Sequence, residues 1–284
     1  MTRLLLGPAS VDRYVDEGLE LPGGGALNIA YHWAHAGEPF TFLTRIGDHD
    51  GGPLVLQFLR RHGIAHLPAS IVARGRTASI DIVMRADRQP FMDHFVEGVW
   101  TGFGLTADEE AMAAAATHLH AVLVDPVVSA VHRLGDTGAL AHVQASGDFL
   151  DFRHYTVERF AATMAHLSLG FIGWPGAVDD PVIAGVRQVA ARLHRTVVVT
   201  LGSRGVLLMD GIRAEERFVP VHAVQVEGTT VGCGDAFIAA FLAAYWAGAG
   251  IDTALDRGRE AGAAATRWVR PLPDDAYSAA NRVT

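Results

Sequence analysis

The residues best suited to chemistry stand together late in the chain, as Gly232-Cys233-Gly234-Asp235. Two glycines permit a tight turn, and the apolar run at 237–244 contains no helix breaker, so it predicts a buried helix. Such a turn favours an anion, because its N–H groups are unpaired and the helix dipole is positive there. Asp235 would lie beside a bound phosphate, where a base for phosphoryl transfer has to be. The alternative is a plain turn in which Asp235 caps the helix.

A second glycine-rich turn, Gly23-Gly24-Gly25, opens a predicted helix of small residues that runs to position 36. Adjacent glycines leave no side chains between a ligand and the backbone. Asn28, one turn into this helix, can offer a donor and an acceptor to a hydroxyl-rich ligand. Asp12 follows a predicted first strand at 3–7, near the carboxyl end where open α/β sheets bind ligands. The alternative interpretation of the glycines is a flexible surface loop.

The composition narrows the class of protein. The 284 residues are 50% hydrophobic and 19% charged, which is enough for a substantial core. A net charge of -8 disfavours nucleic acid or an anionic membrane as partner. The single cysteine, Cys233, fits a reducing compartment, and residues 1–7 show no signal pattern. We therefore expect a soluble, cytoplasmic protein.

The absence of lysine from the sequence excludes several chemistries. A Walker A loop, a protein kinase and a Schiff-base enzyme each need a lysine. The 14 histidines show no metal-binding spacing, and no Gly-x-Ser-x-Gly elbow is present. If the chain handles phosphate, backbone amides and arginines must do so.

Apolar strands alternate with helices through most of the chain. Strands are predicted at 40–44, 121–125, 141–145, 169–173 and 196–201, with an antiparallel edge at 206–209 and 213–219. Helices are predicted at 53–62, 107–118, 157–167, 181–193 and 255–268, and near Leu134. This alternation predicts a mostly parallel sheet covered by helices on both faces, in one domain that spans residues 1–284.

The sequence pattern changes at 77–99, where two segments of alternating apolar and polar residues flank a turn at 86–90. A hairpin here predicts a small β-sheet that stands off the main body. Such a flap would suit a lid, because phosphoryl transfer gains from the exclusion of water. An ordinary hairpin insertion is the alternative.

Together these motifs resemble the ribokinase-like (PfkB) sugar kinases. Gly23-Gly24-Gly25-Ala26-Leu27-Asn28, with Gly37 and Gly47-Asp48, is similar to the family's N-terminal motif. Thr200-Leu201-Gly202-Ser203-Arg204-Gly205 resembles its nucleotide-binding turn, and Gly232-Cys233-Gly234-Asp235 its anion hole and catalytic base. The motifs stand in the family's order across nearly the whole chain. The segment 93–98 and the acidic helix after it are most similar to fructoselysine 6-kinases.

The resemblance implies a three-layer α/β/α fold with a small β-sheet lid built from about 12–22 and 77–99, in a homodimer. It implies ATP-dependent phosphorylation of a sugar hydroxyl, with Mg²⁺ and with Asp235 as the base. The anion-hole amides would belong to Gly232, Cys233 and Gly234. Sugar hydroxyls would be bound by Asp12, Gly24, Gly25 and Asn28. The nucleotide would be bound by Thr200, Gly202, Ser203 and Gly205.

The sequence departs from the family pattern at three places. Thr229 stands where an aspartate usually binds an activating monovalent cation. Gly173-Trp174-Pro175-Gly176 replaces the Asn-x-x-Glu that organises magnesium through water. Cys233 stands where alanine is common, and a thiol at a helix N-terminus is expected to have a lowered pKa and to be reactive. Gly234 is expected to need a backbone conformation closed to branched residues.

The acceptor is left open by the sequence. If it is a fructosamine such as fructoselysine, its cationic amine needs a carboxylate, and Glu97 or Asp93 is the candidate. A nucleoside kinase is the alternative enzyme. A catalytically weak sensor of sugars or nucleotides is the alternative outside enzymes, because the Asn-x-x-Glu is missing.

Overall fold

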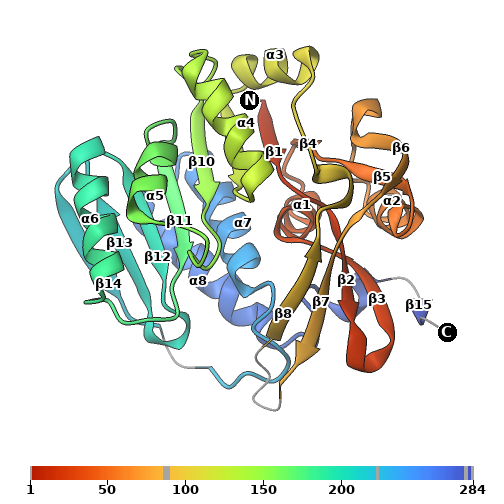
Figure 1. Ribbon diagram of the computed structural model, residues 1–284. Coiled ribbons are helices and arrows are strands. Elements are labelled where there is room, and N and C mark those ends of the chain that lie inside the picture. The colour runs from red at the N-terminus through yellow and green to blue at the C-terminus, as the bar shows by residue number, and fades with distance from the viewer. Residues whose placement is uncertain (1, 86–89, 222–223, 278–280, 283–284) are drawn as a thin grey trace. The chain divides into compact units, whose positions relative to one another are not determined.

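The computed structural model describes residues 2–85, 90–221, 224–277 and 281–282 (Figure 1). The chain divides into two compact units. The first consists of Met1–Leu4 and Gly104–Ala223, and the second of Leu5–Phe103 and Val224–Thr284. Within the described residues no helix has both the length and the apolar character needed to cross a membrane.

The first unit is built on a mostly parallel sheet. Its strands follow the order β9 (His118–Val122), β10 (Gln144–Asp148), β11 (Leu169–Gly173), β12 (Thr196–Thr200), β13 (Val206–Asp210) and β14 (Glu215–Val219). The pairs from β9 to β12 are parallel, and β13 and β14 are antiparallel additions at the edge. Val197, Val198 and Val199 of β12 are completely buried, as a strand covered on both faces requires.

The helices of this unit are α3 (Ala107–Ala115), α4 (Asp125–Asp136), α5 (Val157–Met164) and α6 (Pro181–Leu193). Local sequence sets where they begin. Thr106 and Glu109 form a capping box at α3, and the Thr156 side chain accepts a hydrogen bond from the N–H of Arg159 at α5. These caps satisfy N–H groups that have no partner inside the helix.

The second unit contains α1 (Gly25–His35), α2 (Gly52–Arg61), α7 (Cys233–Trp246) and α8 (Ile251–Ala265). Trp33 Nε1 of α1 donates a 3.0 Å hydrogen bond to the carbonyl of Ala239 in α7. A Cβ at Gly258 of α8 would lie 2.9 Å from the ring of Phe237, so this glycine permits close packing on α7. The three helices α1, α7 and α8 thus form one packed group.

Strand β1 (Arg3–Leu6) runs from the first unit into the second, where β4 (Thr41–Leu43) pairs beside it. Among the described residues the main sheet therefore has eight strands, in the order β14-β13-β12-β11-β10-β9-β1-β4. The predicted α/β class with a mostly parallel sheet is confirmed. A separate parallel pair consists of β5 (Ile46–His49) and β6 (Ile71–Arg76).

The small sheet of the second unit has the order β15-β3-β2-β7-β8. Its strands are β2 (Ser10–Tyr14), β3 (Leu19–Gly23), β7 (Ala78–Met84), β8 (Pro90–Val96) and β15 (Asn281–Arg282) (Figure 1). Tyr14, Leu21 and Ile82 pack together on one face. Arg13 lies within 3.5 Å of both Glu20 and Asp81 on the other. A small β-sheet beside the main one was predicted, and it is confirmed.

Several predicted boundaries were wrong. The strand predicted at 141–145 is Gln144–Asp148, because successive turns, with Gly138 at φ 77°, occupy the residues before it. Asp125 begins α4 instead of ending a strand, and the proline after it lies in the first turn, where proline is favoured. Gly47 and Asp48, which belong to the N-terminal motif, lie in β5.

Candidate active site

The N-terminus of α7 is built by Gly232. This residue is the N-cap, with φ 80°, and α7 begins at Cys233. A Cβ at position 232 would lie 2.5 Å from the carbonyl oxygen of Pro271. Both the positive φ and this close approach favour glycine. The cap is therefore Gly232, and the alternative that Asp235 caps the helix was wrong.

Asp235 lies in the first turn of α7 and faces α1. Asn28 Nδ2 donates a 2.7 Å hydrogen bond to Asp235 Oδ2. Burial raises the pKa of Asp235, and the hydrogen bond from Asn28 opposes that rise. A carboxylate whose pKa lies above its usual range accepts a proton more readily. Asp235 is therefore suited to the role of a base.

Asp12 is the second carboxylate of the site, beside Asp235, and is only 5% exposed. Its pKa is raised to about 7 as the net result of three causes: burial raises it most, a 3.3 Å hydrogen bond from Ser10 Oγ lowers it, and the charge of Asp235 raises it. A Cβ at Gly23 would lie 2.2 Å from the Asp12 carboxyl group. Sequence reasoning did not select Ser10, and it named Gly23 only as part of the glycine-rich turn. The alternation in β2 was the available signal for Ser10, which lies two residues before Asp12 on the same face.

The glycine-rich turn before α1 brings the backbone close to the same group. Gly24 has φ 95°, and a Cβ there would lie 2.9 Å from both the Pro8 carbonyl oxygen and Ser10 Oγ. Gly25 is the first residue of α1. Asn28 Oδ1 is buried and has no hydrogen-bond partner in the described part of the chain. It is placed to accept a hydrogen bond from a ligand hydroxyl.

Gly234 lies in open space. A Cβ at this position would meet no protein atom within 4 Å, and its φ is not positive. The expected restriction on φ was therefore wrong for Gly234 and belongs to Gly232. In the first helical turn N–H groups lack an acceptor inside the helix. The N–H of Cys233 reaches the carbonyl of Thr230 at 3.4 Å.

The expectation of a reactive Cys233 is contradicted. Burial raises the pKa of this thiol to about 12, and the charge of Asp235 contributes in the same direction. The Sγ atom lies 3.8 Å from the carbonyl oxygen of Thr229. The helix dipole does not compensate for loss of water and a neighbouring carboxylate.

Thr229 is buried, and both of its polar groups bond to the backbone. Its N–H donates to the carbonyl of Trp268 at 2.8 Å, and its Oγ1 accepts from the N–H of Val231 at 3.1 Å. The hydroxyl thus stabilises the turn before α7.

The predicted nucleotide turn lies in the first unit, between β12 and β13. Thr200 ends β12, Gly202 and Ser203 form an exposed short helical turn, and Gly205, at φ 143°, precedes β13. Arg204 Nη2 donates to the carbonyl of Pro175 at 2.8 Å, and Trp174 N–H to the carbonyl of Thr200 at 2.8 Å. The segment that replaces Asn-x-x-Glu is thus held against this turn.

The two carboxylates suggested for a substrate amine lie apart from Asp12. Asp93 pairs with Asp81 across the small sheet, which places it on the face opposite Asp12 and Tyr14. Glu97 accepts a 3.1 Å hydrogen bond from Thr101 Oγ1. Among the recorded contacts of the described residues, none joins Glu97 to Asp12, Asn28 or Asp235.

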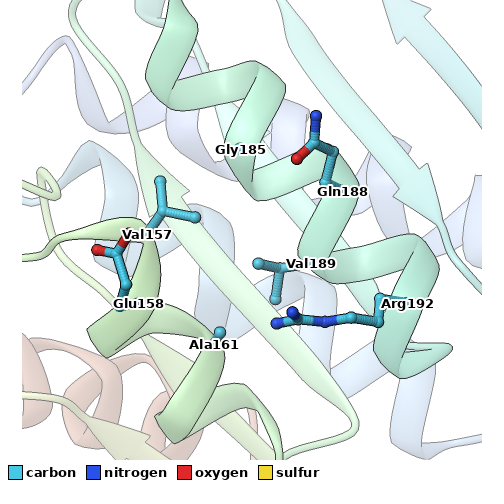
Figure 2. A pocket seen from close by; sticks show the side chains of 7 residues that line it. All are labelled: Val157, Glu158, Ala161, Gly185, Gln188, Val189 and Arg192. Carbon is cyan, nitrogen blue, oxygen red and sulfur yellow. The ribbon is translucent and has the colours of Figure 1, made fainter.

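Within the described part of the chain, neither a metal-binding cluster nor a pocket adds residues to the site around Asp12, Asn28 and Asp235. The described residues include no cluster of three histidine, cysteine, aspartate or glutamate side chains placed to hold a metal ion. A pocket in the first unit lies between α5 and α6, and Arg192 extends across it from α6 (Figure 2). None of the predicted site residues lines this pocket.

The fold is of the mostly parallel α/β class, and comparison with known proteins shows which proteins the chain is similar to. The sequence model of the pfkB family carbohydrate kinases matches residues 172–269. Fructoselysine 6-kinase of Escherichia coli (strain K12) is 29% identical over 259 residues, covering 90% of this chain and 94% of that protein. Cytidine kinase of Thermococcus kodakarensis is 26% identical over 269 residues, covering 90% and 93%. The solved structure of adenosine kinase from Sinorhizobium meliloti superposes with a TM-score of 0.78 at 19% identity, covering 96% of each chain.

The chain is thus similar to the pfkB family carbohydrate kinases, and it has the ribokinase-like fold. It is an ATP-dependent phosphotransferase, as the resemblance implied.

Proposed function

We propose that the chain transfers the γ-phosphoryl group of ATP to a hydroxyl of a sugar derivative, with Asp235 as the base. The observation that carries this proposal is the 2.7 Å hydrogen bond from Asn28 to Asp235 at the open N-terminus of α7. Asp12 lies close enough for its pKa to respond to the charge of Asp235. Two carboxylates and an amide therefore meet where a helix can hold a phosphate.

The acceptor is held by Asp12, Asn28 and the backbone of Gly24 and Gly25. As the hydroxyl oxygen attacks phosphorus, its proton passes to the Asp235 carboxylate. The hydrogen bond from Asn28 favours the ionised form of Asp235, which the reaction needs, and burial keeps its pKa high enough to accept the proton.

The phosphates are bound by backbone N–H groups of Gly232, Cys233 and Gly234. The open space beside Gly234 fits this role, because a Cβ would project into it without meeting protein. The nucleotide is bound through Thr200, Gly202, Ser203 and Gly205. Mg²⁺, when bound, would supply positive charge to neutralise the phosphates, and it would need few protein ligands because such ions usually keep several waters.

The acceptor class is a fructosamine such as fructoselysine, which the 29% identity to fructoselysine 6-kinase supports. Glu97 is the carboxylate proposed for its cationic amine, since Asp93 lies on the other face of the small sheet. The alternative of a nucleoside acceptor is supported by the 26% identity to cytidine kinase.

The small sheet is proposed as a lid within a single kinase domain, in a cytoplasmic homodimer. Phe91, Met92 and Phe95 of β8 are each more than a third exposed, and a second copy of the chain would cover them.

A turnover assay with fructoselysine, D-fructose, D-ribose and cytidine tests the proposal, with a thermal-shift panel on the same compounds. We expect ADP release with fructoselysine, and Glu97→Gln should raise KM for it but not for D-fructose. Stabilisation by these compounds without ADP release would favour a sensor, and turnover of cytidine alone would favour a nucleoside kinase.

A further inference from the structure

Residues 266–277, which follow α8 and are called here the C-terminal strap, contact the turn before α7 and then the small sheet. The N–H of Gly228 donates to the carbonyl of Thr266 at 2.9 Å, and that of Thr229 to Trp268 at 2.8 Å. Pro271 is the residue that leaves no room for a Cβ at Gly232. The first half of the strap thus supports the turn that leads into α7.

The second half of the strap reaches the small sheet. The Arg270 guanidinium lies 4.2 Å from the centre of the Tyr14 ring and pairs with Glu17. Tyr277 packs against the cluster of Tyr14, Leu21 and Ile82. The strap therefore places a second tyrosine beside Tyr14.

Two side chains at the C-terminal end of α2 hold the end of the strap in place. Arg61 Nη2 donates to the carbonyl of Asp275 at 3.0 Å, and His62 Nε2 lies 2.7 Å from the carbonyl oxygen of Ala276. A carbonyl can only accept, so His62 Nε2 carries the proton. His62 Nδ1 then accepts from His35 Nε2, at 3.1 Å. These contacts fix the backbone immediately before Tyr277.

The hydroxyls of Tyr14 and Tyr277 are both buried, and neither has a hydrogen-bond partner in the part of the chain that the structure describes. Burial raises the pKa of each phenol, and the charge of Asp12 raises both further. Tyr14 also raises the pKa of Tyr277. Since Tyr14 lies two residues after Asp12 in β2, the two side chains share a face. Two unpaired hydroxyls and the Asp12 carboxyl group therefore lie close together.

An unpaired buried hydroxyl loses its hydrogen bonds to water and gains none in return, so a pair of them beside a buried carboxyl needs an explanation. We propose that Tyr14 and Tyr277, with Asp12, form a subsite for a hydrogen-bond-donating substituent of the acceptor, a hydroxyl or an ammonium group. The inference rests on the proposed function and names two specificity-determining residues for it. Arg61 and His62 are positioning residues that act through Tyr277.

Such a subsite would suit an acceptor larger than a simple pentose. Asn28 and the glycine-rich turn are placed for the hydroxyls nearest to Asp235. The phenols lie on the side of Asp12 that is occupied by the strap and the small sheet, and a substituent there would satisfy both of them.

The variants Tyr14→Phe and Tyr277→Phe separate this role from simple packing. Each removes one hydroxyl that has no partner in the free protein, so the free energy of unfolding should stay the same or rise. Binding of fructoselysine without nucleotide, measured by calorimetry, should weaken about tenfold or more in each variant. A tyrosine difference spectrum on addition of fructoselysine should shrink in both.

Tyr155→Phe is the matched control. The Tyr155 hydroxyl donates a 2.9 Å hydrogen bond to the carbonyl of Leu123 in the first unit. Its loss should lower the free energy of unfolding and leave fructoselysine binding unchanged, which is the opposite pattern. His62→Phe should raise KM and leave kcat within about twofold, because it releases the strap without touching the base.

Unchanged affinity in both folded phenol variants would overturn the subsite, as would a wild-type protein that binds none of fructoselysine, D-fructose and cytidine. Failure of the proposed function gives a different result, in which the wild-type protein binds a probe but releases no ADP. Affinity in the phenol variants still decides the inference in that case.

Discussion

Asp12→Asn should change how the stability of the protein depends on pH. The wild-type carboxyl has a pKa of about 7 in the folded state against 3.8 for the ordinary group. The folded state therefore holds the proton more tightly than the unfolded state, so the free energy of unfolding falls as pH rises between these values. A difference of about three pKa units corresponds to roughly 4 kcal/mol, and the 5% exposure of Asp12 leaves little solvent to screen it.

Urea unfolding of both proteins at intervals from about pH 4 to pH 8 measures this effect, since ΔG at each pH follows from linear extrapolation. The stability of Asp12→Asn relative to wild type should rise by about 4 kcal/mol across the range. Ser10→Ala should enlarge the loss in the wild-type background, because the hydrogen bond from Ser10 lowers the pKa of Asp12. A wild-type minus Asp12→Asn difference that stays constant within about 1 kcal/mol would refute the account of this carboxyl.

The remaining predictions concern the start of α7. Gly232→Ala should destabilise the protein by about 1–3 kcal/mol in urea unfolding, because φ is 80° and Pro271 blocks the Cβ. Gly234→Val should leave a stable fold and lower kcat/KM for ATP. Normal kinetics in Gly234→Val would place the phosphate elsewhere. Cys233 should react slowly with a thiol reagent at neutral pH even without ATP, since its pKa is about 12, and rapid labelling would contradict this. Turnover should change little when K⁺ is replaced by a large organic cation at equal ionic strength, because Thr229 supplies no carboxylate; strong activation by K⁺ would show that other groups bind it.

Local signals made the glycine-rich turns, α7 and the parallel strands predictable. Gly24 and Gly232 stand where φ is positive, and apolar runs such as Val197-Val198-Val199 identify buried strands from sequence alone. The pKa of Cys233 was mispredicted because the helix dipole acts locally, whereas burial depends on the whole fold.

The long-range contacts were not predictable in the same way. The place of Asp93 depends on the pairing of β7 with β8, and a shift of one residue would move it to the other face. Tyr277 packs near Tyr14 from the opposite end of the chain, through a segment whose only helix is the short 3-10 turn Asp274–Ala276. No hydrophobic periodicity in the sequence predicts such a contact.

The turnover of Asp235→Asn tests the central claim most directly. Asparagine keeps the size of the side chain and removes its ability to accept the proton. The account predicts that kcat falls by about 10²–10⁴ with the acceptor that the wild-type protein uses best, while the affinity for an ATP analogue changes little. Near-normal turnover in this variant would contradict the assignment of Asp235 as the base and with it the proposed mechanism.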